Sequence, residues 1–185
     1  MDDRELAERC LTGDESAIRH FVERFEGPVL AVCIRQLRNR EDAEDVAQQT
    51  LVRAVRHLRH WDQQRSLDPW VLTIAVNRCR THLSQRKLRA KSFDPALDSP
   101  ARDTRLGTID LSEELQLALG KIRDDYRTCF ILFYQQELSV AEVAATMKCP
   151  EGTVKTWLHR ARRELAELLI ERGVVTKDGY ELHRI

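Results

Sequence analysis

The sequence predicts an all-α fold of two small helical domains joined by a flexible linker. Apolar residues recur every three or four positions through most of the 185-residue chain, and no run keeps the two-residue alternation of a β-strand. Charged residues make up 32% of the chain and aromatic residues only 6%, which is typical of a helix-rich protein without a large aromatic core. From 89 to 111 the periodicity stops and Pro, Ser and Asp gather, as in a linker. We therefore expect domains at 1–88 and 112–172 and a C-terminal tail at 173–185.

The N-terminal domain is expected to open with a helix that presents Ala17, Phe21 and Phe25 on one face. Gly27-Pro28 should end this helix, because proline has no N–H to donate to the helical hydrogen-bond ladder. A second helix should follow Pro28, which is tolerated in a first turn. Its expected inward residues are Leu30, Cys33, Ile34 and Leu37.

Two more helices are expected before the linker. Asn39 is the predicted N-cap of the third, whose first turn is rich in acid, as favours a helix N-terminus. Its predicted inward residues are Ala43, Val46, Ala47, Thr50, Ala54 and Leu58. Asp68 as N-cap and Pro69 at the first helical position predict the start of the fourth helix. The fourth helix is expected to bury Trp70, Val71, Ile74, Ala75 and Leu83.

The C-terminal domain is also expected to hold four helices. The first starts at Ser112, and the second carries Tyr126, Phe130 and Phe133. Ser139 followed by Glu142 fits a capping box that opens a short third helix. The fourth should turn five apolar residues inward: Val154, Leu158, Ala161, Leu165 and Leu168.

A short capped helix, a tight turn and a longer helix together predict a helix-turn-helix. The outward face of the last helix carries donors and acceptors suited to major-groove base edges and phosphates. These residues are Thr153, Lys155, Thr156, His159, Arg160 and Arg163. An ordinary solvated basic helix in a bundle is the alternative, but the capped helix before it favours the helix-turn-helix.

The formal net charge is zero, which by itself argues against a nucleic-acid binder, but the charges are segregated. Between 78 and 91 there are six basic residues and no acid, and the segment 148–163 has a local net charge of +4. Two separate basic patches are therefore predicted in a neutral chain.

Other classes of protein are not favoured. No Ser/His/Asp or Cys/His set stands at motif spacing, and seven glycines leave little room for a phosphate-binding loop, so no enzyme is expected. Five cysteines without a Cys-x-x-Cys pair are expected to be reduced and packed as small apolar residues, with no metal or cofactor. No membrane-spanning run or secretory signal is found, so we expect a cytoplasmic protein without membrane insertion.

Four segments closely resemble the bacterial extracytoplasmic-function sigma factors of the sigma-70 family. In the second half, Leu138-Ser-Val-Ala-Glu-Val-Ala-Ala145 and Gly152-Thr-Val-Lys-Thr-Trp-Leu-His-Arg-Ala-Arg162 are similar to the promoter-reading domain. In the first half, Asp42-Ala-Glu-Asp-Val-Ala-Gln-Gln-Thr-Leu51 resembles the polymerase-binding helix. Trp70-Val-Leu-Thr-Ile-Ala-Val-Asn77 looks like the start of the promoter-melting helix.

The resemblance implies a sigma factor that binds core RNA polymerase and directs promoter-specific initiation. The last helix would read the minus-35 element as duplex. The loop 61–67 and the fourth helix would bind the melted minus-10 element through Trp61, Asn77, Arg80, Arg86 and Lys87. Contacts with core polymerase would come from Asp42, Asp45, Gln48 and Gln49. Such factors are commonly silenced by an anti-sigma protein, which is therefore an implied partner.

Some positions depart from the family pattern. Glu137 stands where Gly often ends the preceding helix, and Lys148 occupies the turn position where helix-turn-helix proteins favour Gly, which predicts backbone strain there. Trp157 replaces a common Arg, and we expect it to be a packing residue. A stand-alone helix-turn-helix regulator is the alternative function, but such a protein would not need an acid-rich docking helix followed by a basic one.

Overall fold

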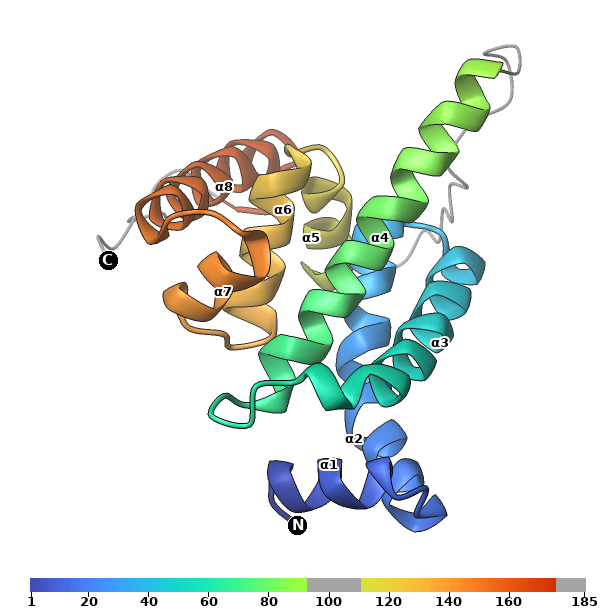
Figure 1. The fold of residues 1–185 in the computed structure, drawn as a ribbon. Coiled ribbons are helices and arrows are strands. Elements are labelled where there is room, and N and C mark those ends of the chain that lie inside the picture. The colour runs from blue at the N-terminus through green and yellow to red at the C-terminus, as the bar shows by residue number, and fades with distance from the viewer. Residues whose placement is uncertain (93–110, 176–185) are drawn as a thin grey trace. The chain divides into compact units, whose positions relative to one another are not determined.

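The structure is a computed structural model that describes residues 1–92 and 111–175, and every regular element in these ranges is helical, as predicted (Figure 1). The first of two compact units contains α1 (Asp3–Leu11), α2 (Glu15–Leu37), α3 (Arg40–His57), the 3-10 turn η1 (Leu58–His60) and α4 (Leu67–Ser92). The second contains α5 (Leu111–Leu119), α6 (Asp124–Phe130), the π-helical turn η2 (Ile131–Gln135), residues 140–144 of α7 (Val140–Met147) and α8 (Glu151–Glu171). Most of the expected linker and of the expected tail lie outside the described residues. α4 continues to Ser92, past the expected domain boundary at 88.

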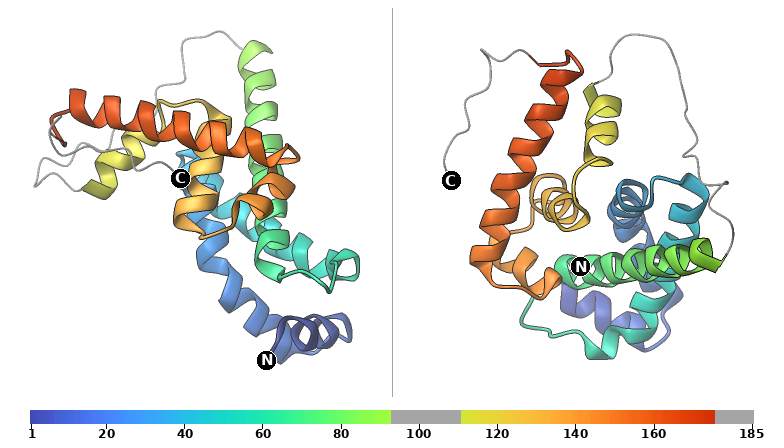
Figure 2. Two further views of the ribbon diagram at one scale, coloured as in Figure 1. Left: turned by 90° about the vertical axis from the view of Figure 1, so that its left-hand side faces the viewer. Right: turned by 90° about the horizontal axis from the view of Figure 1, so that it is seen from above.

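The first unit is organised around α2, which packs against α1, α3 and α4 and is seen from two further sides in Figure 2. Phe21 and Phe25 are fully buried on α2, with ring centroids 4.7 Å apart. The predicted inward residues of α3 are all buried, and Asn39 caps this helix through a hydrogen bond from the Asp42 N–H to its side chain, 2.9 Å long. These predictions are therefore confirmed.

The predicted helix break at Gly27-Pro28 is wrong, since α2 continues through both residues. Its buried residues form one unbroken stripe, which includes the predicted Cys33 and Leu37: Ala17, Phe21, Phe25, Val29, Val32, Cys33, Gln36 and Leu37. A proline in a helix interior costs about 3 kcal/mol, whereas each fully buried large apolar side chain contributes about 1.5–3 kcal/mol. Packing of the continuous stripe therefore outweighs the lost hydrogen bond. The predicted inward residues Leu30 and Ile34 are only half-buried.

The start of α4 also differs from the prediction. The helix begins at Leu67, and the Asp68 N–H donates to the Ser66 hydroxyl oxygen at 3.3 Å, so Asp68 is not the N-cap. The Asp68 carboxylate instead accepts a hydrogen bond from Arg24 of α2 at 2.6 Å.

The buried face of α4 is rotated from the predicted one. Val71 and Ala75 are buried as expected, but Trp70, Ile74 and Leu83 are half-buried. Leu67, Leu72, Val76 and Cys79 take up the remaining core positions. The hydrophobic pattern therefore identified the helix but not its inward face.

The core of the second unit joins α5, α6 and α8. One core cluster there consists of Ala118, Leu119, Ile122, Tyr126, Ala161 and Leu165. Trp157 packs half-buried against this cluster, so its predicted packing role is confirmed. Leu168 also packs against it but is only half-buried.

The helix-turn-helix is built as predicted from α7 and α8. Ser139 and Glu142 form the capping box, in which the Ser139 N–H donates to Glu142 Oε2 at 2.8 Å and the Glu142 N–H donates to Ser139 Oγ at 3.2 Å. Lys148, in the turn, has a φ of 54°, and Glu137 also has a φ of 54°. Both residues thus adopt the left-handed conformation that favours glycine, which confirms the strained turn.

All five cysteines are free, and four of them are buried, which agrees with a packing role. The Cys79 thiol donates a hydrogen bond to the Cys33 sulfur, and the two sulfur atoms are 3.7 Å apart. This hydrogen bond and burial together raise the pKa of the Cys33 thiol. Within residues 1–92 and 111–175, no helix combines the length and apolar character that crossing a membrane requires.

Candidate nucleic-acid interface

The outward face of α8 brings together the six residues predicted to read duplex DNA. Thr153 is half-buried, and the other five are exposed: Lys155, Thr156, His159, Arg160 and Arg163. The buried Val154, Leu158 and Ala161 on the opposite face fix this orientation. A helix with this arrangement presents a row of donors that can enter a major groove.

Three of these six side chains already have partners within the second unit. The Thr156 hydroxyl donates to the Gly152 carbonyl at 2.9 Å, and Arg163 pairs with Glu167 at 2.9 Å. Arg160 donates from Nη1 to the Tyr126 hydroxyl at 3.0 Å. Lys155 and His159 make no hydrogen bond or ion pair with the described residues and are therefore the most available for a ligand.

In the first unit, residues predicted to contact polymerase on α3 face basic residues of α4. The Asp42 carboxylate lies 3.3 Å from His82 Nε2 and 4.0 Å from Arg86 Nη1. Gln49 donates to Asp45 at 2.6 Å and accepts a hydrogen bond from Arg78. These side chains line a groove of about 340 Å³ between α3 and α4. Gln48 is exposed on the same helix.

The residues predicted to bind the minus-10 element fall into two groups. Asn77, Arg86 and Lys87 are exposed on α4, and Arg80 is half-buried there. Trp61, by contrast, is buried with 6% of its surface exposed, so its ring is not available to a base in this structure. Trp61 instead anchors the start of the loop that leads to α4.

A second groove, of about 360 Å³, lies beside this basic helix and was not predicted. It is lined by Arg53, His57, His60, Trp70, Ile74, Asn77, Arg78 and Thr81. The half-buried Trp70 and Ile74, which were predicted to belong to the core, supply apolar surface to this groove. An aromatic ring among cations is the combination that binds unstacked bases and single strands.

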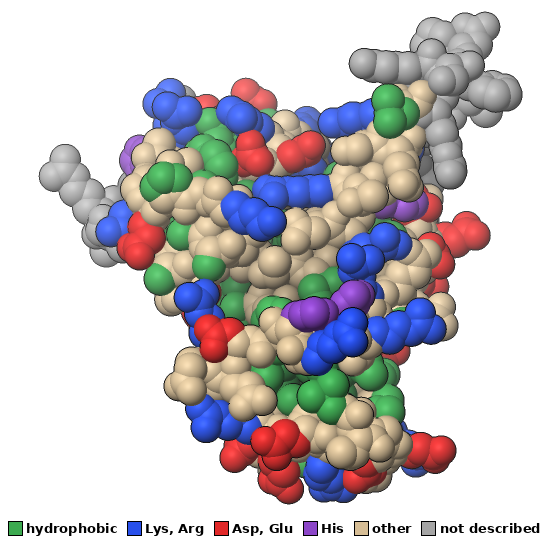
Figure 3. All heavy atoms as spheres, in the orientation of Figure 1, with side chains coloured by type: hydrophobic (Ala, Val, Ile, Leu, Met, Phe, Trp, Pro, Cys, Tyr) green, Lys and Arg blue, Asp and Glu red, His purple; other side chains and the backbone are tan. Residues whose placement is uncertain are grey.

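The sequence does contain a signal for this groove. Between 53 and 65 there are four arginines and two histidines against the single acid Asp62. In Figure 3, Lys, Arg and His side chains gather over the part of the first unit where α3 and α4 lie. The basic surface of this unit is therefore wider than the predicted 78–91 segment.

Comparison with known proteins identifies a sigma-70 domain in each of the two units. The sequence profile of Sigma-70 region 2 matches residues 21–89, and that of Sigma-70, region 4 matches residues 112–165. The chain is 30% identical over 175 residues to the ECF RNA polymerase sigma factor SigW of Bacillus subtilis, covering 85% of this chain and 91% of SigW.

Two solved structures have the same fold. The sigma factor RpoE from Bartonella quintana, in complex with the anti-sigma factor NepR, is 25% identical with a TM-score of 0.72, covering 82% of this chain and 96% of RpoE. CnrH, in complex with the cytosolic domain of CnrY, is 26% identical with a TM-score of 0.68, covering 91% of this chain and 97% of CnrH.

Two helical units, one matching region 2 and the other region 4, define a DNA-binding regulatory protein of the sigma-70 type. Within that class, this chain belongs to the ECF RNA polymerase sigma factors. It is an alternative sigma factor that directs promoter-specific transcription. The stand-alone regulator considered from the sequence is excluded, because a region 2 domain occupies the first unit.

Proposed function

We propose that α8 reads the minus-35 element as duplex while α4 holds the melted minus-10 element. The observation that carries this proposal is the outward face of α8, where Lys155 and His159 stand exposed beside Thr153 and Arg163. Protein–DNA contacts of this kind combine base-edge hydrogen bonds with phosphate contacts that fix the register. The chain contributes recognition and strand opening, and no catalysis of its own.

The minus-10 contacts are assigned to the groove beside α4. Strand opening requires a base to leave the stack, which costs a few kcal/mol. Trp70 offers a stacking surface, and Arg53, Asn77 and Arg78 surround it with donors. Arg80, Arg86 and Lys87 extend the basic track along the same helix, while Trp61 supports the adjoining loop from within the core.

Docking on core polymerase is assigned to the polar face of α3, against a coiled coil of the largest catalytic subunit. Asp45 and Gln48 are exposed there, and Asp42 and Gln49 line the groove next to them. A neutral protein has little long-range attraction for DNA, so promoter binding depends on polymerase presenting the two basic surfaces together.

Regulation by an anti-sigma factor is also proposed, because the similar sigma factor RpoE from Bartonella quintana was solved in complex with the anti-sigma factor NepR. A cytoplasmic location follows from the proposed partners, which are RNA polymerase and promoter DNA.

Runoff transcription from genomic DNA, with core polymerase in the presence and absence of the chain, tests the function directly. New transcripts that depend on the chain are expected. Their absence under conditions where the chain binds core polymerase would contradict the proposal.

The minus-35 assignment is tested with Lys155→Ala. Promoter affinity should fall by about 1–3 kcal/mol if Lys155 contacts a base, and the salt dependence should weaken if it contacts phosphate. Lys121→Ala is the matched control, since Lys121 is exposed in the same unit but lies before α6. Equal affinity for both variants would remove Lys155 from the interface.

The docking assignment is tested with Asp45→Arg, which should abolish association with core polymerase while the helical content is retained. Glu23→Arg makes the same charge reversal at an exposed position of α2 and should leave association unchanged. Normal recovery of core polymerase by Asp45→Arg would refute the α3 assignment.

A further inference from the structure

Residues 62–66, in the loop between η1 and α4, are all exposed. Two residues of α1 nevertheless form hydrogen bonds with this loop and with the residue that follows it. Arg4 donates from Nε to the Gln63 carbonyl oxygen at 3.1 Å. Asp3 accepts a hydrogen bond from the Leu67 N–H at 2.8 Å, at the point where the loop ends and α4 begins. Two consecutive residues of α1 therefore fix the middle and the end of a loop that lies about 60 positions away in sequence.

Arg24 of α2 connects this contact to the first turn of α4. Its Nη1 lies 2.6 Å from Asp3 Oδ1, and its Nη2 lies 2.6 Å from Asp68 Oδ2. The guanidinium sits between two carboxylates and only 31% of the Arg24 side chain is exposed, so the pairing is less screened than a surface ion pair. The same Asp68 oxygen accepts a hydrogen bond from the Ser66 hydroxyl at 3.1 Å.

Between the buried residues Trp61 and Leu67 that flank it, the loop makes few contacts of its own. Its own contacts are a turn in which the Arg65 N–H donates to the Asp62 carbonyl at 2.9 Å, and side-chain contacts made by Asp62. Exposed segments with few apolar contacts open easily, and fixing their backbone costs conformational entropy. The outside contacts from Asp3 and Arg4 therefore order the loop before any ligand arrives.

The two ends of this loop join the walls of the groove assigned to the minus-10 base. His60, two residues before the loop, and Trp70, four residues after it, both line this groove. The loop is thus the covalent link between these two lining residues.

We propose that Asp3 and Arg4 are positioning residues for the minus-10 site: they hold the loop 62–66 in place, so that the groove between His60 and Trp70 is preformed when a base is unstacked. This inference rests on the proposed minus-10 role of α4. Preformed sites bind more tightly because the ordering cost is not subtracted from the binding free energy.

The test uses holoenzyme reconstituted with Asp3→Ala or Arg4→Ala, on the strongest promoter recovered by runoff transcription. Permanganate reactivity of unpaired thymines measures melting of the minus-10 region. Each variant should reduce the melted complex about five- to tenfold, as expected for loss of one or two hydrogen bonds that support the site. Association with core polymerase should remain at the level of the unsubstituted chain.

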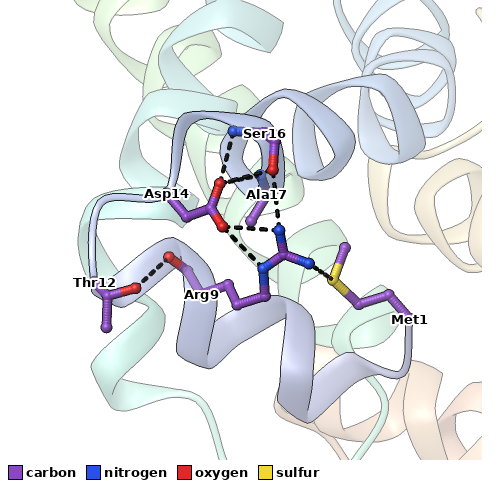
Figure 4. A network of polar contacts seen from close by, with 6 residues as sticks. All are labelled: Met1, Arg9, Thr12, Asp14, Ser16 and Ala17. Atoms are coloured by element: carbon purple, nitrogen blue, oxygen red, sulfur yellow. Dashed lines mark hydrogen bonds and ion pairs between the residues drawn. The ribbon is translucent and has the colours of Figure 1, made fainter.

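Arg9→Ala is the matched control, because it removes another charged contact of α1, at the opposite end of the helix. Figure 4 shows Arg9 paired with Asp14 at the turn between α1 and α2, with an N–O distance of 2.8 Å. This variant should lose stability without reducing melting. The positioning role would be overturned if all three variants melted the minus-10 region as well as the unsubstituted chain. It would also be overturned if all three lost melting to the same extent.

Trypsin cleavage after Arg65 provides a readout of loop order in the full chain. Asp3→Ala and Arg4→Ala should accelerate this cleavage, and Arg9→Ala should not. Faster cleavage with unchanged melting would also overturn the proposal, because the loop would then not need to be held. Lys87→Ala distinguishes failure of the minus-10 assignment from failure of the positioning role. If Lys87→Ala leaves melting unchanged, the minus-10 assignment of α4 fails. If Lys87→Ala reduces melting but Asp3→Ala and Arg4→Ala do not, only the role of α1 is refuted.

Discussion

Arg160 on the outward face of α8 is hydrogen-bonded to the hydroxyl of the buried Tyr126 on α6, at 3.0 Å. This hydrogen bond raises the pKa of Arg160, and the Arg123 guanidinium lies 5.6 Å from the centroid of the Tyr126 ring. One of the six residues assigned to the minus-35 contact is therefore tied to the core of its own domain. Such support limits the freedom of a long side chain before it meets DNA.

Replacing Tyr126 with Phe should weaken minus-35 binding less than Arg160→Ala does, because the guanidinium remains but loses its support. In the double variant, Tyr126→Phe should add no further loss to that of Arg160→Ala, as expected for residues that act through one contact. Fluorescence anisotropy of a minus-35 duplex with holoenzyme measures both effects. Tyr134→Phe, at an exposed tyrosine, is the control. Additive losses in the double variant would show that the two residues act independently.

Replacing Pro28 with Ala should stabilise the first unit. Restoring a helical N–H recovers about 3 kcal/mol of helix propensity. Removing the proline also makes the unfolded chain more flexible, which reduces the gain in stability by about 0.4–1 kcal/mol. A net gain of about 2 kcal/mol in the free energy of unfolding is expected from urea titrations. Gly27→Ala, where a Cβ would meet no atom within 4 Å, should gain about 1 kcal/mol as a reference. If Pro28→Ala lost stability, packing of the proline ring would contribute more to stability than the missing hydrogen bond costs.

Replacing Lys148 or Glu137 with Gly should relieve the left-handed backbone. Relief of about 1–2 kcal/mol exceeds the entropic cost of glycine, about 0.5–1 kcal/mol, so each variant should gain up to about 1 kcal/mol. Lys155→Gly, in the interior of α8, should lose about 1 kcal/mol, which gives a control of opposite sign. Thermal unfolding followed by circular dichroism measures the three variants. Destabilisation of both Lys148→Gly and Glu137→Gly would contradict the strain argument.

The ion pair between Glu114 of α5 and Arg172 after α8 should make the second unit acid-sensitive. The hydrogen bond from Arg172 lowers the pKa of Glu114. A carboxyl whose pKa is lower in the folded state stabilises the fold above its unfolded pKa, about 4.3, and that contribution is lost as the pH falls through the folded value. Glu114→Gln should therefore be less stable than the unsubstituted chain at pH 7, and the difference should shrink below about pH 4.

Urea titrations at a series of pH values measure this dependence, with Glu113→Gln at the exposed neighbouring position as control. A stability difference that stays constant between pH 7 and pH 3 would show that the carboxylate charge is not involved.

Local chemistry in the sequence was sufficient to predict the second unit well. The capping box at Ser139 and Glu142 and the strain at Lys148 each depend on residues within a few positions. In the first unit, prediction failed where distant residues decide the outcome. Pro28 remains helical because α3 and α4 cover a stripe on both sides of it, and Asp68 leaves its predicted cap role because Arg24 binds its carboxylate.

The candidate site also has one part that depends on local sequence and one part that depends on distant residues. The outward face of α8 follows from helical periodicity alone, so its residues could be named in advance. The groove beside α4 depends on how far α3 and η1 are rotated against α4, and periodicity does not contain that angle. For this reason Trp70 was assigned to the core, and the basic residues from Arg53 to His60 were not recognised.

If α3 binds polymerase and α4 binds DNA as proposed, the bonds that join the two helices make these two interactions interdependent. Asp42 and Gln49, assigned to polymerase, are the partners of His82, Arg86 and Arg78, which stand on the helix assigned to DNA. When polymerase attracts the oxygens of Asp42 and Gln49, Arg86 and Arg78 lose a competing anion and dipole and gain affinity for phosphate. Thermodynamic reciprocity then requires promoter DNA to strengthen the hold on polymerase by the same factor. Gln49→Ala, which removes the hydrogen bond to Arg78, would thus lower the cooperativity between the two ligands.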